Sequence, residues 1–163
     1  MKKLLTIIFA FTLFCNSSFG QYAQTVKETA TAMLKAKEKK DYDAYVDYFY
    51  PGDIKMRGGK AAFIKQLQVN DKQSQLMGFN INKKESLGKV SKIYKAGKEL
   101  QCTIEWNIRK GRLISRWHML GVSGDQGKTW KFILTAGLTP SQVQAMVPKF
   151  NQALTWVDYN EEI

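Results

Sequence analysis

This sequence is poor in the residues that form covalent cross-links and metal cages, because it has only two cysteines and one histidine among 163 residues. Cys102 is the single cysteine beyond the first twenty residues, so the rest of the chain cannot form an intrachain disulfide. With His118 as the only histidine, a metal site rich in histidine or cysteine is excluded, although a carboxylate site is not. The sequence therefore predicts a domain stabilised by its core, and it gives no reason to expect a cofactor.

Long apolar runs are also scarce, and the one near the N-terminus is too short to span a bilayer. Two lysines precede the apolar run 4–14, and small and polar residues follow it. This order is typical of a cleaved secretory signal peptide, whereas a membrane-spanning helix needs roughly twenty apolar residues. We therefore expect residues 1–20 to be removed on export to the periplasm or the medium. Phe14 precedes Cys15 where a lipidated cysteine would need a small neighbour, which disfavours a lipid anchor.

Residues 21–163 contain no internal repeat, low-complexity block or linker, which predicts a single domain. The chain is 44% apolar and long enough to bury a core without disulfides. Its net charge is +11, and the basic residues are scattered along it. In an exported protein such a charge favours anionic envelope surfaces or acidic polymers over genomic nucleic acid.

In the first half of the chain apolar residues recur at helical spacing, and in the second half apolar and polar residues alternate, as is typical of strands. The predicted helices span 22–40, 41–50 and 60–76, with Pro51-Gly52 ending the second helix. The predicted strands span 79–87, 89–95, 99–109, 112–122 and 129–135, and a last helix runs from 139 or 140 to 147. The fold class is therefore α+β, with N-terminal helices packed on a curved antiparallel sheet.

The central hairpin can be given a register. A two-residue turn at Lys110-Gly111 would place Arg109 opposite Arg112. Strict alternation then gathers apolar residues on an inward face without any acid, and the polar pairs on the other face predict a solvated surface. The predicted inward pairs are Cys102 with Met119, Ile104 with Trp117, Trp106 with Ser115, Ile108 with Leu113, Phe132 with Met119, Leu134 with Trp117 and Gly121 with Trp130; the outward pairs are Glu105 with Arg116 and Thr103 with His118.

The order of these elements resembles the NTF2-like superfamily. The features that carry the resemblance are two helices, a tyrosine-rich segment ending Tyr50-Pro51, a helix start at Gly58-Gly59-Lys60 and long antiparallel strands. The resemblance covers residues 22–135 and includes no diagnostic motif. It implies a cone in which a curved sheet wraps helices around a pocket, as in SnoaL-like cyclases and ketosteroid isomerases. The tail from about 139 to 163 lies outside this pattern and would cap the cone or pack on the sheet.

The sharpest local motif is S-x-D-x-G-x-T-W, which runs from Ser123 to Trp130. Asp125 can accept hydrogen bonds from turn amides, Gly127 can take a positive φ, and Trp130 returns to the core. Motifs of this kind, called Asp boxes, repeat once per blade in sialidase-like propellers. The single copy here favours a structural hairpin over a glycan-cleaving enzyme.

Candidates for catalysis are weak. Isomerase-like chemistry needs an inward carboxylate in an apolar pocket, and only Asp43, Asp47 and Asp53 could supply one. Asp43 and Asp47 have the spacing of a solvated helix stripe. No acid or second ligand is fixed beside His118, so the sequence gives it no catalytic or metal role.

The predicted inward face is the better candidate for binding. It combines Trp106, Trp117, Met119 and Phe132 with one hydroxyl, Ser115, although the same residues could form a filled core. We therefore predict an exported, NTF2-like, non-enzymatic domain that binds a small apolar ligand or a protein partner. The alternatives are a SnoaL-like or isomerase-like enzyme with an aspartate base, and an electrostatic binder of an anionic envelope component. No nucleic-acid partner is expected, and homodimerisation is left open.

Overall fold

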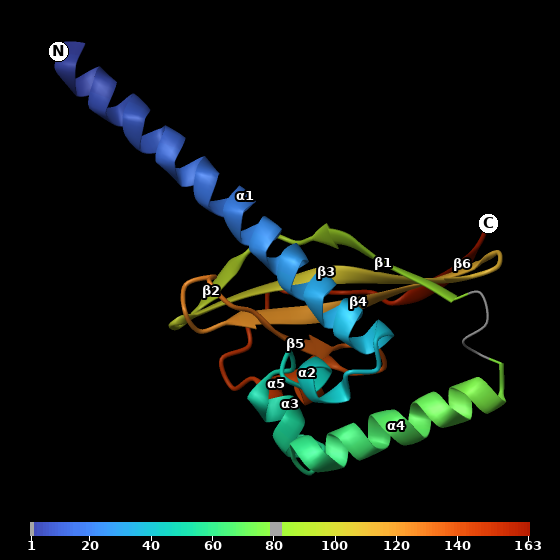
Figure 1. Ribbon diagram of the computed structural model, residues 1–163. Coiled ribbons are helices and arrows are strands. Elements are labelled where there is room, and N and C mark those ends of the chain that lie inside the picture. Colours follow the sequence, from blue (N-terminus) through green and yellow to red (C-terminus); the bar gives the residue numbers. More distant parts are fainter. Residues whose placement is uncertain (1, 79–82) are drawn as a thin grey trace.

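The computed structural model describes residues 2–78 and 83–163, and the backbone alone for residues 2–19. Its helices are α1 (Lys2–Glu38), α2 (Tyr42–Val46), α3 (Pro51–Met56), α4 (Lys60–Leu76) and α5 (Pro140–Met146). Its strands are β1 (Lys83–Val90), β2 (Tyr94–Ala96), β3 (Glu99–Lys110), β4 (Leu113–Ser123), β5 (Lys131–Leu134) and β6 (Tyr159–Glu162). The fold is α+β, with helices followed by a curved, unclosed antiparallel sheet (Figure 1). Within the described residues, no helix is long and apolar enough for a membrane crossing.

The predicted helix 41–50 is wrong in its second half. Tyr48 lies in a turn and Phe49 forms a bridge to Phe132 of β5, where the Tyr50 amide donates to the Phe132 carbonyl at 2.9 Å and the Phe132 amide to the Tyr48 carbonyl at 2.8 Å. Pro51 then begins α3 instead of ending a helix. Proline suits the first helical turn because its missing N–H would have no partner there.

The strands before the central hairpin also differ from their prediction. The sheet has the order β1-β3-β4-β5, with β2 beside β3 and β6 beside β4. Strand β1 continues through Gly88 to Val90, with a bulge, so the predicted break between 79–87 and 89–95 is wrong. A Cβ at Gly88 would overlap the Glu105 side chain, so this glycine permits close packing and does not form a turn. Residues 79–82 of the first predicted strand lie outside the described residues.

The predicted helix 22–40 is confirmed at its C-terminal end only, because α1 begins at Lys2, whereas helix 60–76 is confirmed as α4. The other remaining elements are confirmed to within a residue or two at each end. The predictions 99–109, 112–122 and 129–135 correspond to β3, β4 and β5, and the last helix is α5. Thr139 caps α5 by accepting a hydrogen bond from the Gln142 amide, and the Gln142 side chain accepts one from the Thr139 amide. This is a capping box, which explains why the helix begins at Pro140.

The predicted hairpin register is shifted by two residues. Lys110 pairs with Leu113, so the turn consists of Gly111, with φ 60°, and Arg112. Glycine at the first turn position suits a type II′ turn, whereas the predicted turn would have needed a positive φ at Lys110. A shift of two keeps each side chain on its predicted face. The observed pairs are Trp106–Trp117, Cys102–Gly121, Ile104–Met119, Ile108–Ser115, Glu105–His118, Thr103–Leu120, Asn107–Arg116, Met119–Leu134 and Gly121–Phe132.

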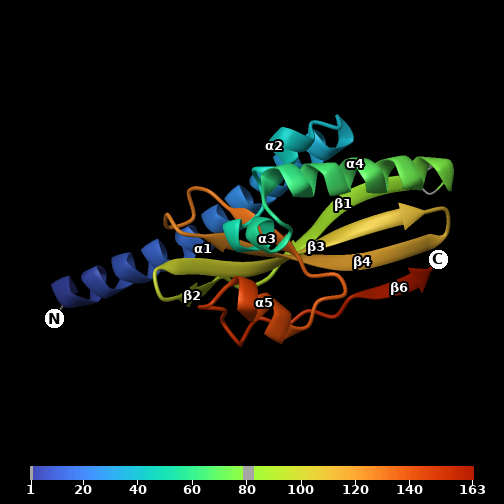
Figure 2. The same ribbon diagram turned by 90° about the horizontal axis from the view of Figure 1, so that it is seen from below.

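The sheet is covered on both faces, so the prediction of a solvated outer face is wrong for much of that face. Helices α1, α2 and α4 lie on the inner face, and α5 with the chain after it lies on the outer face (Figure 2). Two clusters of buried residues result, one on each side of the sheet. The outer cluster consists of Leu120, Val122 and Ile133 packed on Val143, Met146, Val147, Phe150 and Leu154. The C-terminal tail therefore packs on the sheet, one of the two placements expected.

Candidate functional site

Rows of side chains cross the inner face at the hairpin end of the sheet. Partners in register share a face, so β1, β3 and β4 each contribute one residue to every row. From the hairpin end inward the rows are Lys83–Lys110–Leu113, Glu85–Ile108–Ser115 and Leu87–Trp106–Trp117. The inner face therefore changes from cationic to aromatic as it approaches the core.

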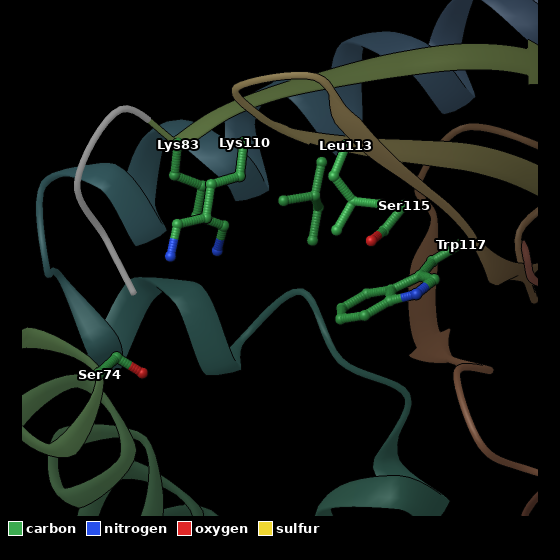
Figure 3. A pocket seen from close by; sticks show the side chains of 7 residues that line it. Ser74, Lys83, Lys110, Leu113, Ser115 and Trp117 are labelled. Atoms are coloured by element: carbon green, nitrogen blue, oxygen red, sulfur yellow. The ribbon is translucent and has the colours of Figure 1, made fainter. Parts of the chain in front are cut away.

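A cavity of about 300 Å³ opens over these rows. Figure 3 shows Lys83 and Lys110 beside each other on the sheet side and Ser74 of α4 facing them across the space. The volume lies at the lower end of the range for small-molecule pockets. Its lining combines apolar side chains with hydroxyls and amines: Ile108, Leu113, Trp117, Ser74, Ser115, Lys83 and Lys110. This combination suits an amphipathic molecule.

The predicted binding residues are divided between this cavity and the core. Ser115 and Trp117 line the cavity. Trp106, Met119 and Phe132 are buried in the cluster beneath α1 and α2. The predicted face is thus part pocket and part filled core.

Glu85 places a carboxylate on the inner face, where the sequence predicted none. Its Oε1 lies 2.8 Å from Lys37 Nζ and 2.7 Å from Lys83 Nζ, and its Oε2 accepts a hydrogen bond from Trp106 Nε1 at 3.0 Å. Burial raises the pKa of Glu85, but the two lysines more than offset that effect and hold the pKa below its usual value. Burial also lowers the pKa of Lys37, against the attraction of Glu85. Glu85 is therefore an ionised anchor between two cations.

Trp106 connects this ion cluster to the cavity wall. The Lys37 Nζ lies 4.4 Å from the Trp106 ring centroid, and the Trp106 and Trp117 rings meet edge-on at 5.6 Å. Such contacts contribute beyond the area they bury, and they restrict both rings to one orientation. The ion cluster thus helps to hold Trp117 where it lines the cavity.

The aspartates considered as bases lie elsewhere. Asp43 and Asp47 are exposed and pair with Lys60, as a solvated helix stripe would. Asp53 is buried, and its Oδ1 accepts a hydrogen bond from Arg57 Nε at 2.8 Å. Burial raises the pKa of Asp53 and Arg57 opposes the rise. None of the three lines the cavity described here.

His118 has an acidic partner that the sequence did not reveal. Its Nδ1 lies 2.9 Å from Asp158 Oδ1, just before β6. On the same outer face, Arg116 pairs with Glu161 of β6. These contacts join the C-terminal strand to β4, which gives His118 a structural explanation.

The Asp-box motif forms a closed hydrogen-bonded turn. Asp125 Oδ1 accepts from the Thr129 amide at 2.9 Å and from Ser123 Oγ at 2.8 Å. The Gly127 amide donates to Ser123 Oγ at 2.8 Å, and Gly127 has φ 84°. Trp130 is buried, and its Nε1 donates to the Gly127 carbonyl at 3.2 Å. The polar groups of this turn are therefore bonded to one another.

Replacing Asp125 with Ala should destabilise the protein by about 1 kcal/mol at neutral pH. This value is smaller than the pKa shift alone would give, because solvent screens a carboxylate near the surface. The Thr129 amide holds the pKa of Asp125 at about 2. Because the pKa is lowered in the folded state, the ionised carboxylate stabilises the fold above pH 3.8, and this stabilisation is lost as the pH falls toward 2. Urea unfolding should show the gap between wild type and variant shrinking with acid. Gln126→Ala in the same turn is the control, and a gap independent of pH would contradict the assignment.

Sequence reasoning missed several residues of the site. Glu85 and Lys83 lie in β1, and the sequence analysis assigns no face to the residues of that strand. The alternation of Lys83, Glu85 and Leu87 was the available signal. Lys37 and Ser74 reach the site from α1 and α4, and no local pattern indicates such tertiary contacts.

Comparisons with known proteins identify no relative of this chain. No family model, curated protein or solved structure matches the chain. Among the described residues, no group of three or more His, Cys, Asp or Glu is placed to hold a metal ion. The site geometry is therefore the basis for the functional argument.

Proposed function

We propose that this chain is a non-enzymatic binding domain for a small amphipathic molecule with an anionic group. The apolar part would contact Trp117, Ile108 and Leu113, and the anionic group would face Lys83 and Lys110. The observation that carries the proposal is the cavity of about 300 Å³ whose lining changes from amine to aromatic. A few polar groups in a mostly apolar pocket commonly fix the orientation of a ligand.

The electrostatics of the cavity support an anion over a cation. Lys83 and Lys110 are direct neighbours across β1 and β3, and like charges at such positions repel. Glu85 partly compensates Lys83. An isomerase-like base would need a carboxyl with a raised pKa at this cavity. The lysines lower the pKa of Glu85, and Asp53, whose pKa burial raises, does not line the cavity. The ionic arrangement thus favours binding over proton transfer.

An NTF2-like cone and export belong to the same proposal. The helices before a curved sheet, with a cavity between α4 and the sheet, are compatible with such a cone. The signal-like order of residues 1–20 supports export. Mass spectrometry of the N-terminus after expression in an exporting host would test the second point.

The test uses two dyes that differ by one sulfonate, 8-anilinonaphthalene-1-sulfonate and neutral N-phenyl-1-naphthylamine. Ser115→Trp should fill the cavity and weaken the binding of both dyes at least about tenfold, which corresponds to about 1.4 kcal/mol. Lys110→Gln should weaken binding of the sulfonate dye about fivefold and binding of the neutral dye less than about twofold, because only the sulfonate interacts with the lysine charge. Fluorescence titration gives the dissociation constants.

Ser86→Trp is the matched control, since Ser86 is exposed on the opposite face of β1. It should leave both dissociation constants unchanged. Equal effects of Ser115→Trp and Ser86→Trp would contradict binding in this cavity. Equal effects of Lys110→Gln on the two dyes would contradict the anionic preference.

A further inference from the structure

Four parts of the chain meet at one end of the molecule. In both ribbon views the turn between β3 and β4, the start of β1, the end of α4 and the end of β6 lie at the same end of the molecule (Figures 1 and 2). The start of α1 lies at the opposite end. The cavity opens within this group of elements, since α4, β1, β3 and β4 supply its lining.

Basic side chains dominate this end of the sheet. Lys83 faces Lys110 and Lys84 faces Arg109 in register, so like charges lie opposite each other twice. Such pairs destabilise a sheet unless an anion compensates them. We define the basic rim as Lys83, Lys84, Arg109, Lys110 and Arg112, of which all but Lys83 are exposed.

Acidic groups near the basic rim are fewer, and those that the structure describes there pair with basic side chains. Glu161 pairs with Arg116, and Glu162 lies 4.0 Å from Arg112. Glu85 is turned inward, between Lys37 and Lys83. The basic rim therefore keeps an excess of positive charge.

Exposed apolar side chains accompany the basic rim. Leu76 is 80% exposed, Met77 66% and Leu113 46%. Leu76 and Met77 follow Ser74 at the end of α4, and Leu113 stands beside Lys110 in register. An acidic polymer would need only the cations. A bilayer interface would contact both the basic and the apolar side chains, because anionic headgroups attract cations and the acyl boundary accepts Leu and Met.

We propose that the basic rim, with Leu76, Met77 and Leu113, docks on the surface of a bilayer that contains anionic phospholipid. The cations contact headgroup phosphates and the apolar side chains enter the acyl boundary. This docking places the cavity at the lipid surface. It does not depend on the cavity being occupied, so it stands apart from the proposed function.

The experiment measures sedimentation of the full chain with phosphatidylglycerol-containing vesicles and with pure phosphatidylcholine vesicles. Lys84→Glu with Arg112→Glu should reduce the ratio of the two partition coefficients at least about 25-fold, since each basic residue near such a surface contributes about fivefold. Lys27→Glu with Lys35→Glu on the exposed side of α1 changes the net charge equally and should alter the ratio less than about threefold. Any anchoring by residues 1–20 is common to all variants and cancels.

The apolar part of the proposal has its own variant. Leu76→Ser with Met77→Ser should reduce partition into the anionic vesicles about tenfold, because two exposed apolar side chains no longer enter the acyl boundary. Unchanged partition of that variant would overturn membrane docking in favour of an acidic polymer. Equal ratios of the partition coefficients for the two charge-reversed variants would overturn the role of the basic rim in docking. Ser115→Trp should keep vesicle binding while losing the dyes, which separates this proposal from the proposed function.

Discussion

Replacing Glu85 with Gln should lower the free energy of unfolding by about 3 kcal/mol. The change leaves Lys37 and Lys83 beside each other in a largely buried setting, without the carboxylate that lies 2.8 Å and 2.7 Å from them. Removing one partner of a buried ionic group costs several kcal/mol because the remaining charge is uncompensated. Urea unfolding at pH 7, followed by far-ultraviolet circular dichroism, measures the difference.

Glu38→Gln is the matched control, because Glu38 is exposed at the end of α1. It should change the unfolding free energy by less than about 0.5 kcal/mol. Adding Lys37→Met to Glu85→Gln should recover part of the loss, since it removes one of the two uncompensated charges. Similar losses for Glu85→Gln and Glu38→Gln would show that the cluster does not stabilise the fold.

The loss from Glu85→Gln should also depend on pH. The pKa of Glu85 is lower when folded than its ordinary 4.5, so the ionised carboxylate stabilises the fold above 4.5. As the pH falls through the folded pKa, wild type becomes protonated and approaches the variant. The gap between them should therefore shrink in acid, and a constant gap would mean that shape, and not charge, accounts for it.

The face of each central strand could be predicted from the sequence, although its register could not. Alternation assigns Trp106 and Trp117 to the inner face whatever the turn, because a shift of two residues preserves the face. The register depends on where Gly111 lies in the turn, and φ 60° at Gly111 with a type II′ geometry decides it. The sequence was therefore sufficient to assign the β3 and β4 side chains of the cavity wall to one face, and insufficient to give their partners across the strands.

Contacts between distant segments account for what was missed. Leu120 and Ile133 point outward, and this signal of a covered outer face was present in the sequence, but only the packing of the C-terminal tail explains it. The ion cluster joins Lys37 to Glu85 across α1 and β1, and Asp158 reaches His118 from the last segment. Local periodicity contains no information about such pairs.

Gly127→Ala should cost about 3 kcal/mol, the second large effect expected here. Gly127 has φ 84°, and a Cβ there would overlap the Tyr22 ring of α1. The positive φ alone costs about 1–2 kcal/mol for alanine, and overpacking adds a similar amount. Thermal and urea unfolding measure the sum.

Gly111→Ala separates these two terms. Gly111 also has a positive φ, 60°, yet nothing lies within 4 Å of a Cβ built on it, so its replacement should cost only about 1 kcal/mol. In a Tyr22→Ala background the cost of Gly127→Ala should fall toward the same value. Equal costs for Gly111→Ala and Gly127→Ala in the wild-type chain would mean that Tyr22 moves aside freely. The predicted difference instead makes the Asp-box turn a fixed contact that holds α1 against the sheet, and α1 in turn carries Lys37 to Glu85 and Trp106.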